Sequence, residues 1–429
     1  MSFQLSPDQD SAVAGILNTL LHPGSGDHSL AVLTGSAGTG KTTVIKEIIR
    51  VLEDTHPCTK VELAASTHRA AKVLSDIVNM PVATGHNIFK LRPTIGAGGK
   101  ESLKSTGVCA VSMGAIVIID EASMIGNKFL AAIVDTIKLL RLNVLFVGDP
   151  FQLPPPGDTC SLFDGSLPTY TLTQVHRQAG GNPILEKANE FREFIEGIRK
   201  EEPLINTDIN AKGEGIHVLP HADFIAQFVQ KYVNYNAGTE VDIPLCTFTN
   251  ESAINYNSMI RKAAYFLEDS IQPFYVGEQL ISNAIVMKGR ITLLANNESV
   301  IVQGWGAHTH EGIPGYAVRV KGTYIEKTRT AVKEVFCPQS KIIADKGLKE
   351  IKAKAIHGEV PWSQFYELKQ YMADLRPPFA GTTHKAQGGT FPAVFIDKVN
   401  INKCRDPRTK ARLLYVALTR ASNHVYINS

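Results

Sequence analysis

A glycine-rich turn constrains the fold of this chain more than any other feature. Residues 35–42 read Gly35-Ser-Ala-Gly-Thr-Gly-Lys41-Thr42, which fits the pattern G-x-x-x-x-G-K-[ST] in full. The turn follows the apolar run Leu30–Leu33 and opens a helical pattern over Thr42–Leu52. Glycines let the N–H groups of such a loop face phosphate oxygens, and the helix N-terminus adds about half a positive charge. The turn predicts a nucleotide site in which Lys41 neutralises phosphate charge and the Thr42 hydroxyl holds Mg²⁺.

Composition excludes several other classes of protein. The chain has 429 residues, which at about 150 residues per domain predicts about three domains. Hydrophobic residues make up 44% and charged residues 20%, as in globular proteins with a real core. The six cysteines form no C-x-x-C pair, which argues against a zinc ribbon or a disulfide scaffold. Because there is neither a secretion signal nor an apolar run of about 20 residues, we expect a cytoplasmic protein without a membrane partner.

Strand-like and helix-like segments alternate over the first 170 residues. The strand candidates are unbroken apolar runs, which is typical of strands buried on both faces of a parallel sheet. These runs are Leu30–Leu33, Val61–Ala65, Ile116–Ile119 and Val144–Val147. Helical patterns lie between them over Thr42–Leu52, Ala70–Val78 and Lys128–Leu140. The alternation predicts a doubly wound α/β domain.

A second α/β stretch follows, interrupted by a β-rich segment. Its expected helices are Pro183–Gly197, Phe224–Asn236, Ser252–Phe266 and Thr409–Thr419, and its expected strands are Ile216–Leu219, Leu245–Thr249, Val394–Asp397 and His424–Ile427. From Tyr275 to Lys341, short strands with frequent turns replace helical periodicity. This texture predicts a small inserted β-barrel, followed by helices over Leu348–Ile356 and Ser363–Leu375.

Two acids end the third buried run. Asp120 and Glu121 follow Ile116–Ile119, and two carboxylates at a strand tip are costly without a partner. A metal ion with a bound water would supply that partner, so Asp120 is expected to contact Mg²⁺ and Glu121 to orient and deprotonate the attacking water. The alternative is a solvated strand end.

Two glutamines are further candidates for the nucleotide site. Gln152 follows the buried run Val144–Val147 in a Gly-Asp-Pro turn, where its amide can bond a γ-phosphate or its water. Gln9 stands in Ser6-Pro7-Asp8-Gln9, which makes a good helix capping box and so gives Gln9 a sufficient structural role.

In this order, the motifs resemble those of superfamily 1 helicases of the RecD-like branch, and within it the Dda type of bacteriophages. The phosphate loop, Asp120-Glu121 and Gly148-Asp149-Pro-x-Gln152 are shared with many ATPases. The more specific segments are Ala65-Ser-Thr67-His68-Arg-Ala-Ala-Lys72, Thr84-Gly-His86, Leu172-Thr-Gln-Val-His-Arg177, Thr247-Phe-Thr-Asn250, Thr383-His384-Lys385-Ala-Gln387-Gly388 and Leu414-Tyr415-Val-Ala-Leu-Thr419-Arg420. The resemblance covers nearly the whole chain.

The resemblance implies two RecA-like motor domains with ATP bound in the cleft between them. Motor domain 1A would span 1–170, with a small pin insertion 1B at about 91–110. Motor domain 2A would span 171–274 and 381–429, and an SH3-like barrel with helices, 2B, would span 275–380. Lys41, Glu121, Gln152, Arg177 and Arg420 would be catalytic, with both arginines placed across the cleft from Lys41. The ATP-binding set would be Gln9, as an adenine contact, with Gly38, Thr39, Gly40, Lys41, Thr42, Thr43 and Gly388.

Single-stranded DNA would cross the motor domains, held by phosphate contacts and base stacking because a motor must hold any sequence. The resemblance implies the contacts Thr67, His68, Thr84, His86, Asn250, Thr382, Thr383, His384, Lys385, Trp362 and Tyr366. For Trp362 and Tyr366 the helical spacing equally favours packing against the barrel. An RNA track is also open, because phosphate contacts do not distinguish the sugars.

The pin departs from the family pattern. The Dda type carries an aromatic wedge near the pin tip, whereas residues 92–107 contain none, and Leu103 is the nearest bulky side chain. Either Leu103 serves as the strand-separating wedge or strand separation depends less on stacking. In the family, barrel and helices brace this pin.

These features predict an ATP-dependent DNA helicase that moves 5′ to 3′ on single strands, unwinding duplex and displacing bound proteins. The direction comes wholly from the resemblance. The alternative is an ATP-driven translocase that remodels protein–DNA complexes and unwinds weakly; the complete set of ATPase residues argues against a structural DNA-binding protein. We expect a monomer acting on DNA forks, with single-strand-binding or replication proteins as candidate partners.

The charge balance bears on the grip. The formal net charge is +3, and residues 321–354 carry nine Lys/Arg against four Asp/Glu, so 9 − 4 = +5, leaving −2 for the rest. The basic stretch lies either beside the track or on a solvated face. The nearly neutral net charge predicts that a motor of this kind contacts few phosphates at once and therefore holds DNA lightly enough to move along it.

Overall fold

Two compact units make up the chain. The computed structural model describes residues 5–23, 27–95, 101–105, 109–174, 181–233, 244–264, 272–289, 291–322 and 331–429. Unit 1 comprises Met1–Val218 with Thr382–Ser429, and unit 2 comprises Leu219–Gly381. The division groups residues 171–218 and 382–429 with the first 170 residues, so the three-part scheme 1A, 2A and 2B stays a prediction.

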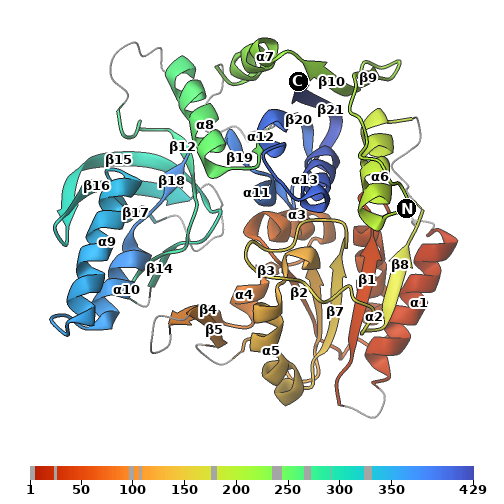
Figure 1. Ribbon diagram of the computed structural model, residues 1–429. Helices are drawn as coiled ribbons and strands as arrows, with labels where there is room; N and C mark the ends of the chain where they lie inside the picture. The colour runs from red at the N-terminus through yellow and green to blue at the C-terminus, as the bar shows by residue number, and fades with distance from the viewer. Residues whose placement is uncertain are drawn as a thin grey trace. The chain divides into compact units, whose positions relative to one another are not determined.

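A six-stranded parallel sheet organises the first part of unit 1 (Figure 1). Its strand order is β3-β2-β6-β7-β1-β8, and every pairing is parallel. The strands are β1 (Leu30–Gly35), β2 (Val61–Ala65), β3 (Val82–Thr84), β6 (Ile116–Asp120), β7 (Asn143–Gly148) and β8 (Thr169–Leu172). The doubly wound α/β prediction is confirmed. The short edge strands β3 and β8 were not among the expected strands.

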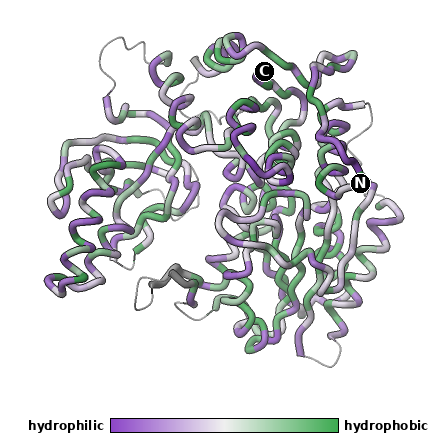
Figure 2. The backbone as a smooth tube through the Cα atoms, in the orientation of Figure 1, coloured by the Kyte–Doolittle hydropathy of each residue, from purple (hydrophilic) through white to green (hydrophobic). Residues whose placement is uncertain are grey.

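Helices cover both faces of this sheet, which explains the unbroken apolar runs. One face buries residues of α1 (Pro7–Leu21), α2 (Lys41–Thr55) and α3 (His68–Val78), and the other buries α4 (Gly85–Ile88) and α5 (Asn127–Leu140). Figure 2 shows the hydrophobic stretches running along these strands. All strand carboxyl ends therefore meet at one edge of the sheet, where the loops carry the candidate residues.

An antiparallel hairpin leaves this layer after α4. β4 (Leu91–Ile95) pairs with β5 (Glu101–Ser105), in the region expected to form the pin. The short helix η1 (Ala122–Met124) follows β6.

The remainder of unit 1 contains a second set of strands with their helices. β20, β21, β10 and β9 are neighbours in that order, and α6 packs along α13. The elements are α6 (Pro183–Glu196), β9 (Asp208–Ile209), β10 (Gly215–Leu219), α11 (Thr383–Ala386), β20 (Phe391–Ile396), α12 (Lys398–Ile401), α13 (Pro407–Thr419) and β21 (Ala421–Asn428). The last two turns of α13 are buried on all sides, so this part of the helix lies in the core.

Unit 2 combines helices with antiparallel sheets. The strand order β17-β16-β15-β12-β18 forms one sheet, β13 and β14 form a hairpin, and β11 and β19 are neighbours. Valines from one face of the large sheet form its core. The elements are α7 (His221–Val233), β11 (Leu245–Thr247), α8 (Asn250–Ala264), β12 (Gln279–Ser282), β13 (Val286–Lys288), β14 (Ile291–Leu294), β15 (Ser299–His310), β16 (Ile313–Gly322), β17 (Lys333–Pro338), α9 (Lys341–Ile356), α10 (Trp362–Tyr371), β18 (Leu375–Arg376) and β19 (Ala380–Thr382).

The predicted β-rich texture is confirmed, while its SH3-like identity stays a prediction. The predicted start of α9 was wrong, because that helix begins at Lys341. The predicted end of α10 was also wrong, because this helix ends at Tyr371 and Leu375 pairs in β18 with Ser282 of β12. Met372 is extended, which ends the helix before the chain reaches that strand.

Candidate functional site

The glycine-rich turn joins β1 to α2 at the carboxyl edge of the first sheet. Gly38 and Gly40 have φ of 86° and 83°, a backbone region that side chains rarely adopt. The Lys41 amine lies back over the loop and donates to the carbonyls of Gly35 at 2.7 Å and Ser36 at 3.0 Å. The Ser36 hydroxyl is buried without a hydrogen-bond partner. The loop thus has the fold that its sequence predicted, with polar groups available to phosphates.

Gln9 is buried at the start of α1 and holds the same loop. Its side-chain oxygen accepts from the Ser6 N–H at 3.1 Å, as the capping box predicts, and its amide donates to the Thr39 carbonyl at 3.1 Å. A Cβ at Gly40 would collide with the Gln9 amide nitrogen, so glycine permits this approach. Gln9 therefore fastens α1 to the loop, while its adenine contact stays a prediction.

Asp120 ends β6 and Glu121 follows it in the left-handed conformation, with φ of 52°. The Asp120 carboxylate accepts from the Glu121 N–H at 2.8 Å. Burial, with the charge of Glu121, raises the pKa of Asp120 to about 7, although Lys41 opposes the shift. The two acids thus form a site where an added cation would be stabilising.

Asp149 and Gln152 lie in the loop after β7, and both are buried. Burial raises the pKa of Asp149, while Lys41 and a hydrogen bond from Tyr415 oppose the shift. The Tyr415 hydroxyl donates to Asp149 Oδ2 at 2.5 Å, and Arg412 donates to the carbonyls of Pro150 and Gln152, each at 2.7 Å. The sequence predicted no role for Tyr415 or Arg412, since a single polar side chain on a helix does not show which loop it contacts.

Arg420, at the C-cap of α13, approaches the acids. Its guanidinium is buried and lies 4.0 Å from Glu121 Oε1, and it donates to the carbonyls of Gly389 and Val416 at 3.2 and 3.3 Å. This placement brings Arg420 from the far end of the chain to the acidic pair. The other arginine finger candidate, Arg177, lies outside the described residues.

Gln387 belongs to one of the helicase motifs, but the sequence predicted no role for it. It is buried, and its amide donates to Gln152 Oε1 and to the Leu153 carbonyl, each at 3.2 Å. The next residue, Gly388, has φ of 76°, and a Cβ there would press on Ala70. Gln387 thus joins the loop of Gln152 to the segment that begins at Thr382.

Thr67 and Thr84 stand at the same edge of the first sheet, as caps of α3 and α4. The Thr67 hydroxyl accepts from the Ala70 N–H at 3.2 Å, and the Thr84 hydroxyl from the Asn87 N–H at 3.3 Å. His68 and His86 are exposed. Protein atoms nevertheless surround the inner side of His86, and this burial, followed by the charge of His68, lowers its pKa.

The candidates on α11 lie in unit 1 as well. Thr382 caps the helix and is buried, as is Thr383, while His384 and Lys385 are half-buried. Burial lowers the pKa of His384.

Thr43, a candidate nucleotide contact in the helix that follows the phosphate loop, has a half-buried side chain.

Three candidates belong to unit 2. Asn250 opens α8, is exposed and accepts from Arg376 at 3.4 Å. On α10 the rings of Trp362 and Tyr366 stack with centroids 5.9 Å apart and planes at 23°, and Trp362 remains 39% exposed. Both alternatives for these rings, helix packing and base stacking, are compatible with that arrangement.

Leu103 lies in β5 opposite Pro93 rather than at the tip of the hairpin. Its side chain is half-buried and packs against the core that includes Phe129 and Phe89. The wedge role predicted for Leu103 stays a prediction, and its packing anchors the hairpin to one face of the first sheet.

Within the described ranges, no cluster of three or more His, Cys, Asp or Glu side chains could hold a metal ion by itself. In the same part of the chain, no helix has both the length and the apolar character that crossing a membrane requires.

Two family models match this chain. The AAA domain model covers residues 4–218, and the UvrD-like helicase C-terminal domain model covers residues 378–428. The chain belongs to the superfamily 1 helicases. The resemblance proposed from the sequence motifs is therefore confirmed.

Relatives in this helicase family align over nearly the whole chain in one case and over part of it in others. The ATP-dependent DNA helicase Dda of Enterobacteria phage T4 is 26% identical, covering 92% of this chain and 93% of the relative. The ATP-dependent RecD2 DNA helicase of Deinococcus radiodurans is 32% identical over 38% of this chain and 21% of its own length. Among solved structures, a Bacteroides Pif1 helicase has a TM-score of 0.50 at 15% identity, covering 99% of this chain and 92% of that one, which shows the shared fold.

Proposed function

We propose that this protein is an ATP-dependent DNA helicase that translocates on single-stranded DNA. The observation that carries the proposal is the gathering, in unit 1, of the Lys41 loop, the acidic pair and Arg420, with Arg420 4.0 Å from Glu121. The name of the T4 relative, an ATP-dependent DNA helicase similar over 92% of this chain, supports the same activity.

ATP would bind at the loop between β1 and α2. Lys41 would exchange its two loop carbonyls for phosphate oxygens, and the N–H groups of Gly38, Thr39 and Gly40 would line the phosphates. Thr43 and Gly388 complete the proposed nucleotide contacts, and Gln9 would meet the adenine from α1. Glu121 would accept the proton of the attacking water, Gln152 would orient that water, and Arg420 and Arg177 would stabilise charge on the transferring phosphoryl group.

The acidic end of β6 fits a divalent cation. Asp120 has a raised pKa because burial and Glu121 disfavour its charge more than Lys41 favours it. The Thr42 hydroxyl and the Asp120 carboxylate are oxygen ligands of the type Mg²⁺ prefers. When bound, Mg²⁺ would neutralise charge on the β- and γ-phosphates.

Single-stranded DNA would run along the carboxyl edge of the first sheet. The hydroxyls of Thr67 and Thr84 each accept from a backbone N–H, which leaves the O–H hydrogen free to donate to a phosphate. His68, His86, Thr382, Thr383, His384 and Lys385 would add donors from unit 1, and Asn250, Trp362 and Tyr366 from unit 2. The shared fold with a Bacteroides Pif1 helicase solved in complex with ADP-AlF3 and single-stranded DNA is compatible with this track.

Movement from 5′ to 3′ and the division into 1A, 1B, 2A and 2B rest on the family resemblance. Hydrolysis would break the bridge that the γ-phosphate makes to the arginines and so convert chemistry into motion. The protein would act as a monomer on DNA forks, with single-strand-binding or replication proteins as further partners.

A second function is an ATP-driven translocase that displaces proteins from DNA and unwinds weakly. The observation that favours it is that the wedge candidate Leu103 packs its side chain against the core. A forked duplex and a protein roadblock on single-stranded DNA, tested side by side with 5′ and 3′ tails, separate the two functions. Roadblock removal without fork unwinding would favour the second.

The ATP-site assignment is tested by Lys41→Ala. We expect the variant to bind single-stranded DNA normally and to lose DNA-stimulated ATP hydrolysis, because the phosphate charge loses its neutralising amine. Lys46→Ala is the matched control, since Lys46 is exposed on the same helix. Full stimulated turnover in the Lys41 variant would refute the site.

The track is tested by His384→Ala, which should weaken stimulation by DNA while basal hydrolysis persists. An unchanged stimulation curve would remove His384 from the track.

A further inference from the structure

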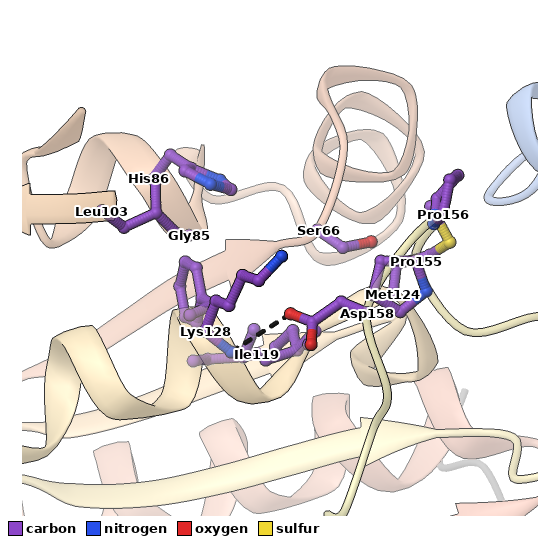
Figure 3. Close-up of a pocket in the computed structure, with 13 residues that line it drawn as sticks. Ser66, Gly85, His86, Leu103, Ile119, Met124, Lys128, Pro155, Pro156 and Asp158 are labelled. Carbon is purple, nitrogen blue, oxygen red and sulfur yellow. Dashed lines mark hydrogen bonds between the residues drawn. The ribbon is translucent and has the colours of Figure 1, made fainter. Parts of the chain in front are cut away.

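A pocket lies beside the first six-stranded sheet of unit 1, and no residue of the phosphate loop lines it (Figure 3). It has a volume of about 210 Å³ and mainly apolar walls. Its floor includes Phe129 of α5 and Ile119 of β6, and Leu103 of the hairpin forms one side. Ligand sites for drug-sized molecules are larger, from about 300 Å³ upward, so this pocket suits one flat ring system.

Aromatic rings line one side of the pocket. His86 meets Phe129 edge to face, with ring centroids 5.1 Å apart. Burial lowers the pKa of His86, so its imidazole is largely neutral near pH 7 and offers a stacking face rather than a charge. Phe129 is buried and held by Phe89, which keeps its ring fixed. The pocket is therefore preformed for a planar ligand.

The position of the pocket along the chain connects it to the track. Ser66, which lines it, immediately precedes Thr67, and Gly85 and His86 immediately follow Thr84. These two threonines are the caps whose hydroxyls can donate to phosphates. A strand whose phosphates contact both threonines would pass across the mouth of the pocket, with one base between them.

Two charged groups stand at the rim. The Asp158 carboxylate accepts from the Lys128 N–H at 3.1 Å, which fixes the loop after β7 against α5 (Figure 3). Gly126 permits this approach, because a Cβ there would collide with that carboxylate. The exposed Lys128 amine lies 3.5 Å from the Gly157 carbonyl and can turn to a base oxygen or a phosphate. The Ser66 hydroxyl is buried without a partner.

We propose that this pocket takes one unpaired nucleobase of the bound DNA strand. The base would leave the stack of its neighbours and lie against His86 and Phe129, with its backbone held by Thr67 and Thr84. Stacking on aromatic rings tolerates any base, as a motor requires. The inference rests on the proposed function as a single-stranded DNA motor.

An abasic scan tests the proposal. A single abasic site is moved through an oligonucleotide, and the affinity of the full-length protein is measured for each position. We expect one position at which loss of the base weakens binding by about fivefold to a hundredfold. A flat profile with ordinary binding would overturn the pocket and leave the proposed function intact. No binding of single-stranded DNA at all would overturn the proposed function itself.

A filled pocket supplies the matched comparison. Met124 is half-buried in the pocket wall, and Met124→Phe should fill the space, flatten the abasic profile and weaken binding of the intact oligonucleotide. Met113→Phe is the control, because Met113 is 68% exposed in the same unit and outside the pocket.

If Met124→Phe fails to fold, Lys128→Ala replaces it, with Lys138→Ala of the same helix as control. We expect the Lys128 variant to lower affinity about threefold or more, the loss expected for one charged contact, and Lys138→Ala to leave it unchanged. A position-specific profile that survives in folded Met124→Phe, or an unchanged affinity in Lys128→Ala, would place the sensitive base elsewhere and overturn the proposal.

Discussion

At the scale of single residues, the acidic end of β6 is electrostatically unfavourable in the free protein at the candidate ATP site. Asp120 and Glu121 are adjacent acids. The charge of Lys41 lowers the pKa of Asp120, but its amine donates to loop carbonyls instead of to the acids. Active sites commonly carry such shifted groups, because charge is arranged there for a ligand that is absent from the free protein.

Because the charge of Asp120 is unfavourable in the folded state, we expect Asp120→Asn to stabilise the free protein. Asparagine keeps the acceptor for the Glu121 N–H and removes a carboxylate that is disfavoured in the folded state. Because the folded pKa, about 7, lies above the reference value of 3.8, the wild type loses stability as pH rises through this range. The melting temperature of the variant should exceed that of the wild type by about 2–4 °C or more at pH 8 and by less at pH 5.

The control for that experiment is Asp135→Asn, which removes an exposed carboxylate from α5. It should leave the melting temperature close to that of the wild type at both pH values. Equal melting of Asp120→Asn and the wild type at pH 8 would mean that the folded protein does not disfavour this charge. The Asp120 variant should also lose ATP hydrolysis, which separates stability from function.

A second residue-scale prediction concerns Gln387. Its amide donates to Gln152 and Leu153 in a buried setting, and its own side-chain oxygen has no partner. Gln387→Ala removes these donors and should leave Gln152 less well oriented. We expect the activation free energy of hydrolysis to rise by roughly 1–3 kcal/mol, which lowers DNA-stimulated turnover about tenfold. Steady-state ATPase with and without DNA measures the effect, with basal turnover less affected.

Thr390→Ala serves as the comparison, since Thr390 is exposed three residues further on. The double variant of Gln152 and Gln387 should lose less than the sum of the two single effects, as expected for residues in contact. Strict additivity would show that the two amides act independently.

At the scale of elements, α1 is tied to the end of β8 as well as to the phosphate loop. Asp8 Oδ2 accepts from the N–H groups of Thr173 at 3.1 Å and Gln174 at 3.2 Å. Burial raises the pKa of Asp8, but hydrogen bonds from Ser6, Gln174, Thr173 and Gln9 together lower it below the ordinary value. The helix that carries Gln9 thus also fixes the segment leading toward Arg177.

Asp8→Ala should therefore lower the free energy of unfolding by roughly 1–2 kcal/mol, as the hydrogen bonds from Ser6, Gln9, Thr173 and Gln174 to a charged, partly exposed acceptor are lost. Because the folded pKa lies below the ordinary one, this stabilisation is present above about pH 4 and disappears as pH falls through the lowered pKa. Urea unfolding at pH 7 and at lower pH measures both. Asp10→Ala, on the exposed side of the same helix, should match the wild type.

The elements also show what sequence patterns can and cannot locate. Buried central strands such as β6 were predicted to within a residue, because both of their faces must be apolar. The edge strands β3 and β8 were missed, since three or four residues of mixed polarity carry too little pattern. Helix α9 begins at Lys341, seven residues before its predicted start, because its first turns are capped by Ser340 and are mostly exposed.

At the scale of the whole molecule, the site depends on contacts that no local pattern contains. Tyr415 meets Asp149 across 266 positions, and Gln387 meets Gln152 across 235. The sequence indicated the phosphate loop and the acids from residue type and spacing. Only family resemblance pointed to Arg420, and nothing in the sequence paired the two glutamines.

The net charge of the whole chain leads to the last prediction. With 44 basic and 41 acidic residues, attraction over the whole surface is weak, so affinity for DNA must come from a few local contacts. On single strands each neutralised phosphate contributes about 0.7 to the slope of log affinity against log salt. Three to five contacts would give a slope of about −2 to −3.5.

Titration of a fluorescent oligonucleotide between about 50 and 200 mM salt measures this slope. The five exposed lysines of α9 offer an internal comparison: Lys341, Lys346, Lys349, Lys352 and Lys354. Replacing Lys346, Lys349 and Lys352 by alanine should lessen the slope by about 2 if this helix borders the track, and leave it unchanged if the helix faces solvent. A wild-type slope steeper than about −6 would contradict a light grip, because it would require more than eight phosphates held at once.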